Sequence, residues 1–170
     1  HRSPAPTDAS YLRPAITDPL PYVENVDYFK HSISDTLLEE IAMQTNLYSV
    51  QKSGGVTSVK TCKEEIEVFI GAILKMGIFN LPQLRMYWSP STRIPSIADA
   101  FKGGVNRFKK LKSCLHFNDN SKTSPTDRDK LYKVRPLVDA VKKACNSLPT
   151  EEKHSIDEQV IPTKGRSAMR

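Results

Sequence analysis

The residue with the clearest potential for chemistry is Asp157, near the C-terminal end of the chain. It lies in a stretch whose side chains alternate as in a β-strand, with Ile156, Glu158 and Val160 on one side. Aspartate is depleted from strand interiors, so it needs a bound cation, a hydrogen-bonded partner or an exposed edge there. The residue types alone leave these three explanations open.

A second group of chemically active side chains lies on a predicted amphipathic helix over residues 105–116. Apolar residues recur on one face at helical spacing, and the remaining positions carry Arg107, Lys109, Lys110 and Lys112. Residues 101–148 contain twelve Lys and Arg against four Asp and Glu, in a chain of net charge +6. This pattern fits contact with a phosphate backbone or an acidic protein, and a solvated face would show the same composition.

The elements that position these groups are predicted to be helices. Apolar residues at helical spacing predict one helix over residues 37–52, and Pro136 opens another that runs to Leu148. Residues 61–77 are apolar nearly all round, which predicts a central helix that is packed on several sides and stops at Gly77. Its start carries the pattern of a capping box, Thr61 to Glu64.

Composition limits the classes of protein to consider. Residues 1–25 are rich in proline and are expected to form a flexible leader. No apolar run is long enough to cross a membrane, so we expect a soluble intracellular protein. The three cysteines and four histidines are scattered, without the spacing of zinc ligands. The aspartates between positions 119 and 129 do not match a calcium-binding loop.

Several stretches, taken in order, resemble the N-terminal half of a piggyBac-type transposase or a domesticated derivative. Each stretch is weak evidence, but the ordered set is specific and covers nearly the whole chain after the leader. The stretches are Phe69–Ile78, Tyr87–Ser89, Asn106–Phe108, Leu115–Asn120, Lys130–Pro136 and Ser155–Gln159.

The resemblance implies a mainly α fold: a multi-helix domain that ends in the first strand of a truncated RNase H-like catalytic domain. The helical domain, over residues 26–150, would serve dimerisation and DNA binding, and residues 151–170 would begin the catalytic domain. Asp157 would be the first of three aspartates that bind Mg²⁺ in a complete parent site, where paired divalent cations support phosphodiester chemistry. The chain stops before the second and third, so we expect neither bound Mg²⁺ nor catalysis from it alone.

The same resemblance implies double-stranded DNA as a partner and the nucleus as the location. The basic residues expected to hold the DNA backbone are Arg107, Lys109, Lys110, Lys112, Lys133, Arg135, Lys164 and Arg166. A homodimer is a further expectation. Two alternatives remain: a domesticated module that binds chromatin proteins without catalysis, and a helical bundle with an acidic protein partner.

Overall fold

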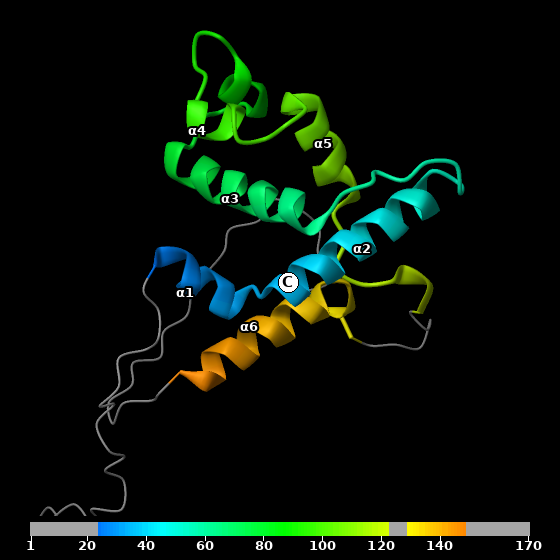
Figure 1. Ribbon diagram of the computed structural model, residues 1–170. Coiled ribbons are helices and arrows are strands. Elements are labelled where there is room, and N and C mark those ends of the chain that lie inside the picture. The colour runs from blue at the N-terminus through cyan, green and yellow to red at the C-terminus, as the bar shows by residue number, and fades with distance from the viewer. Residues whose placement is uncertain (1–23, 123–128, 149–170) are drawn as a thin grey trace, which may run out of the picture.

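The computed structural model describes residues 24–122 and 129–148, and the described part is helical (Figure 1). The long helix α2 crosses the middle, packing against α3 and α5 on one side and α6 on the other, and α6 also packs against α1. The elements are α1 (Asn25–Ser32), α2 (Asp35–Lys52), α3 (Lys63–Phe79), η2 (Leu84–Trp88), α4 (Pro95–Ala98), α5 (Gly104–Cys114), η3 (Asn120–Lys122), η4 (Tyr132–Val134) and α6 (Arg135–Ser147).

Helix α2 confirms the prediction for residues 37–52. The Ser34 hydroxyl caps it by accepting a hydrogen bond from the amide of Leu37 at 3.2 Å. Its apolar face supplies Leu38 and Ile41, which are fully buried in the core. Burial of this face against α3 and α5 stabilises the helix, since most of the stability of a helix in a protein comes from the packing of its apolar face.

An aromatic cluster forms the centre of the core. Phe108 from α5 lies between Phe69 of α3, at 4.7 Å between ring centroids, and Phe101, at 5.4 Å. Trp88 from η2 also approaches Phe108, at 5.4 Å. Phe69, Phe101 and Phe108 are essentially inaccessible to solvent. Three segments of the chain therefore meet at one side chain of α5, which fixes how that helix is rotated.

Helix α1 was not predicted from the sequence, and it packs against α6 at the edge of the molecule (Figure 1). The imidazole Nε2 of His31 lies 3.3 Å from the Ala144 carbonyl and 3.0 Å from the Ser147 hydroxyl. Among the residues of α6, Ala144 is the one that is buried. These polar contacts of His31 join α1 to the C-terminal end of α6.

Helix α3 departs from its prediction in three ways. Its N-cap is Cys62, one residue later than the predicted capping box requires, and the Thr61 hydroxyl donates to Glu65 instead. It passes Gly77 and ends at Phe79, with Asn80 in the left-handed conformation at its C-cap. It is also packed on one side only, because its fully buried residues are Ile66, Phe69 and Ala72.

The predicted ending in a strand of an RNase H-like domain is wrong for this structure. The described residues form helices and connecting segments and include no strand. A strand needs a neighbour for its backbone N–H and C=O groups, and the described part of the chain supplies none. The stretch around Asp157 lies outside the described residues, so the fold class is corrected to all-helical for the part that is described.

Candidate nucleic-acid interface

The orientation of α5 decides which of its basic residues can reach a partner. The helix begins at Gly104, and Gly103 and Gly104 have positive φ angles of 88° and 63°. A Cβ at Gly103 would stand 2.7 Å from the Cβ of Arg107, so only glycine allows this close turn. Phe108 and Leu111 then enter the core, and Lys110 and Lys112 are exposed.

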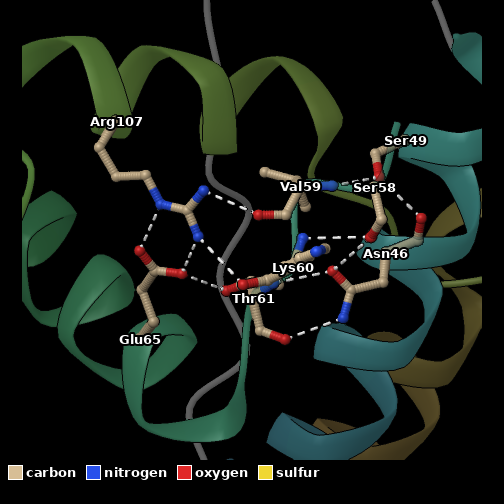
Figure 2. A network of polar contacts seen from close by, with 8 residues as sticks. All are labelled: Asn46, Ser49, Ser58, Val59, Lys60, Thr61, Glu65 and Arg107. Atoms are coloured by element: carbon tan, nitrogen blue, oxygen red, sulfur yellow. Dashed lines mark hydrogen bonds and ion pairs between the residues drawn. The ribbon is translucent and has the colours of Figure 1, made fainter. Parts of the chain in front are cut away.

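The guanidinium of Arg107 faces into the protein, where it ties α5 to α3 and to the segment before α3 (Figure 2). Its Nε and Nη2 atoms each donate to a carboxylate oxygen of Glu65 at 2.6 Å. Its Nη1 donates to the Val59 carbonyl at 2.8 Å, and Nη2 also reaches the Lys60 carbonyl at 3.3 Å. Four hydrogen bonds thus give Arg107 a structural role that its position on a basic helix did not predict.

The segment before α3 is bound to α2 by the Asn46 side chain (Figure 2). The Asn46 amide donates to the Thr61 carbonyl and accepts from the Thr61 amide, both at 2.8 Å. The Ser49 hydroxyl accepts from the Val59 amide at 2.8 Å, which satisfies a second buried N–H group. Lys60 adopts a positive φ of 50° between these two anchors. The segment and Arg107 therefore form one polar connection among α2, α3 and α5.

This connection predicts a dependence of stability on pH. Hydrogen bonds from Arg107, opposed by partial burial, hold the pKa of Glu65 below its ordinary value of 4.5. A lowered folded-state pKa contributes stability that is fully present above pH 4.5 and is lost as the pH falls through the folded value. Urea unfolding from pH about 6 to about 3 should show the difference between wild type and Glu65→Gln shrinking as the pH falls. A difference that stays constant with pH would contradict this assignment.

The exposed side of α5 borders a hollow of about 450 Å³ next to the C-terminal end of α2. Three lysine side chains and several hydroxyl groups face it, which is a surface suited to anionic oxygen atoms. Among the described residues, Lys109, Lys110 and Lys112 make no ion pair, so their charges are not neutralised there. The lining residues are Ser49, Lys52, Ser53, Thr57, Lys109, Lys110, Ser113 and Cys114.

Lys52 is a basic residue of this surface that the sequence did not single out. Its Nζ atom donates to the Ser113 carbonyl at the end of α5, at 3.0 Å, and lies 6.0 Å from the centre of the Tyr48 ring. The Tyr48 ring in turn stacks on His116 at 4.0 Å. Lys52 is 57 residues or more from the α5 lysines in sequence, so no local pattern could have linked it to them.

The other predicted basic residues are dispersed. Lys133 is exposed in η4, a turn that the Asn118 side chain holds through the Tyr132 carbonyl at 2.9 Å. Arg135 bonds Asp129, and these bonds lower the pKa of the Asp129 carboxyl. Lys164, Arg166 and the predicted catalytic and metal-binding Asp157 lie outside the described residues.

Residues 24–122 and 129–148 contain neither a group of metal ligands nor a membrane-spanning helix. No three His, Cys, Asp or Glu side chains come together there as ligands for a metal ion, and Asp157, the residue implied as a Mg²⁺ ligand, lies outside these residues. None of the helices there has the length and apolar character that a membrane span requires. The basic surface of α5 and α2 is therefore the candidate site that the geometry supports.

Comparison with known proteins gives the class to which this helical, basic chain belongs. The family described as Transposase IS4 matches residues 24–170, which covers all of the described part. The human piggyBac transposable element-derived protein 3 is 31% identical over 137 residues, and protein 2 of the same name is 30% identical over 140. Each alignment covers 79% of this chain and 22% of the relative.

The chain belongs to the piggyBac-type transposase family, as its sequence motifs indicated. It spans about a fifth of the length of these two relatives. No solved structure matches it.

Proposed function

We propose that this chain binds double-stranded DNA through the phosphate backbone, as the DNA-contacting part of a piggyBac-type transposase or of a protein derived from one. The proposed contacts are Lys109, Lys110 and Lys112 on α5, with Lys52 beside them. The observation that carries the proposal is that Lys109 and Lys110, which make no ion pair among the described residues, border the hydroxyl-lined hollow, with Lys112 exposed on the same helix. Lysine ammonium groups bind phosphates as point charges and read no sequence, so this contact would be independent of base sequence.

In this proposal Arg107 acts on DNA binding indirectly. Its guanidinium already makes four hydrogen bonds within the protein. These bonds hold α5 against Glu65 and the segment at Val59 and Lys60, which keeps the neighbouring lysines facing outward. Four other basic residues remain proposed secondary contacts with DNA: Lys133 in η4, Arg135 at the start of α6, Lys164 and Arg166.

The experiment is a fluorescence anisotropy titration of a short duplex at about 50 and about 200 mM salt. We expect steep weakening of the wild-type complex with salt, because bound phosphates release counterions. The double substitution Lys109→Glu and Lys110→Glu should weaken binding at least about tenfold and reduce the salt slope by roughly two.

A matched control comes from α6, where Lys142 and Lys143 are also adjacent and exposed. Lys142→Glu with Lys143→Glu makes the same change in net charge at another surface, and we expect a loss of less than about threefold. Equal weakening by both double variants would mean that net charge alone attracts DNA, and affinity independent of salt would overturn the proposal.

A second candidate is a domesticated protein that associates with DNA without transposition; the names of both human relatives describe them as transposable element-derived. In that case the chain would act as a nuclear, chromatin-associated module. We keep Asp157 as a proposed metal ligand of a complete parent site, and we propose no catalysis by this chain alone. Measuring metal-dependent cleavage of nicked or hairpin DNA by the purified chain tests this expectation, since any cleavage would contradict it.

A further inference from the structure

Ser113 lies in the last turn of α5, where its exposed side chain lines the hollow between α5 and α2. Its hydroxyl donates a hydrogen bond to the Lys110 carbonyl at 2.8 Å, within its own helix. Its backbone carbonyl accepts a hydrogen bond from the ammonium group of Lys52, on α2, at 3.0 Å. An exposed hydroxyl group therefore stands at the end of α5, beside a cation that another segment of the chain supplies.

Lysines of α5 surround the same hydroxyl group. Lys109 and Lys110 precede Ser113 by four and three residues, so the three side chains are neighbours on the helix surface. Lys112 is the adjacent residue, and no Asp or Glu occurs between Gly103 and Phe117. Together with the ammonium group from α2, these lysines give the Ser113 hydroxyl a strongly positive surrounding.

We infer that Ser113 is a phosphorylation site for a basophilic protein kinase and that its phosphate turns off DNA binding, a second half that rests on the proposed function. Such kinases recognise serines by basic residues on the N-terminal side, through complementary acidic groups of their own. The kinase transfers the γ-phosphoryl group of ATP to the Ser113 oxygen. A new O–P bond replaces the bond from the γ-phosphorus to the departing ADP, and the hydroxyl proton passes to the catalytic base of the kinase.

The position of Ser113 suits a kinase better than that of the other hydroxyl groups of the hollow. Helix ends fray at little cost in free energy, so the last turn of α5 can open to enter an active site. Ser49 is only 5% exposed, and its hydroxyl accepts from the Val59 amide. Thr57 is exposed, but the preceding residues Ser53–Val56 carry no charge. Exposure and a basic N-terminal flank therefore coincide at Ser113.

A phosphate on Ser113 would compete with DNA for the same ammonium groups. It adds a charge of about −1.5 to −2 at pH 7 and three strong acceptor oxygens. Lys109 and Lys110 are placed to pair with it from the same helix, and Lys52 from α2. The helix dipole disfavours an anion at the C-terminal end of α5, so the phosphate depends on these lysines for its stabilisation. The cations proposed to hold DNA would thus be neutralised within the protein.

The first test treats the whole chain with ATP and protein kinase C, a basophilic kinase, and locates the phosphate by mass spectrometry. Three serines of the chain follow a Lys or Arg by three residues: Ser96, Ser113 and Ser167. The test therefore uses a background with Ser96→Ala and Ser167→Ala, in which we expect phosphate at Ser113. Adding Ser113→Ala to this background should abolish that signal. A background chain without phosphate at Ser113 would overturn the inference.

The second test repeats the anisotropy titration at about 50 and about 200 mM salt, with and without kinase treatment of the background chain. Phosphorylation should weaken DNA binding about tenfold at the lower salt and reduce the salt slope by about one to two. The variant that also carries Ser113→Ala should bind alike, within about twofold, before and after treatment. Circular dichroism should show the same helix content in both forms, because the loss comes from neutralised charge.

The outcomes separate the inference from the proposed function. Unchanged DNA affinity of a chain that carries the phosphate would overturn the regulation and leave the proposed function standing. An untreated chain without DNA affinity would refute the proposed function and the regulation with it, while mass spectrometry would still decide whether Ser113 is a kinase substrate. A loss of helix content on phosphorylation would refute the electrostatic cause.

Discussion

Replacing Phe69 by alanine should lower the free energy of unfolding by about 3–5 kcal/mol, the range for removing a buried phenylalanine. Phe69 is 0% exposed, and its ring packs on Phe108 at 4.7 Å. The substitution removes apolar burial and leaves a cavity among rings that other segments of the chain hold in place. Urea unfolding followed by circular dichroism measures the loss.

The same helix provides the control for this prediction. Phe79 is also a phenylalanine of α3, but its side chain is 48% exposed. Phe79→Ala should cost less than about 1 kcal/mol, because about half of its surface already meets water. Similar losses at the two positions would mean that α3 is not packed on the side described.

Replacing Arg107 by alanine should cost about 2–3 kcal/mol, because it removes the guanidinium that donates twice to the Glu65 carboxylate and once to the Val59 carbonyl. Arg107→Lys should recover less than half of the loss, since an ammonium group cannot reproduce the planar two-point contact with Glu65. Lys110→Ala on the exposed face of the same helix should stay within about 0.5 kcal/mol of wild type.

DNA binding distinguishes a structural Arg107 from one that contacts phosphate. At a temperature where Arg107→Ala is fully folded, the slope of log affinity against log salt should match that of wild type. A residue that contacts a phosphate would lower this slope by about one when it is removed. A reduced slope for Arg107→Ala would therefore show that its intramolecular bonds are exchanged for DNA on binding.

The arginine illustrates a limit of sequence interpretation at a candidate site. Helical periodicity correctly separated Phe108 and Leu111 from Lys110 and Lys112, because it depends only on the geometry of one helix. It grouped Arg107 with the lysines, since all are cationic. The partner that gives Arg107 its role, Glu65, is 42 residues away, and no local pattern records that contact.

The sequence by itself determined the family, the long helices α2, α5 and α6, and the basic character of α5. Periodicity and ordered motifs carry this information within one segment or in a simple order of segments. Only the tertiary structure decided that Lys52 lies beside the α5 lysines and that α3 buries just one side. A helix that is apolar all round fits a buried position and an interaction surface equally well, because its pattern says which residues share a face and leaves open what that face meets.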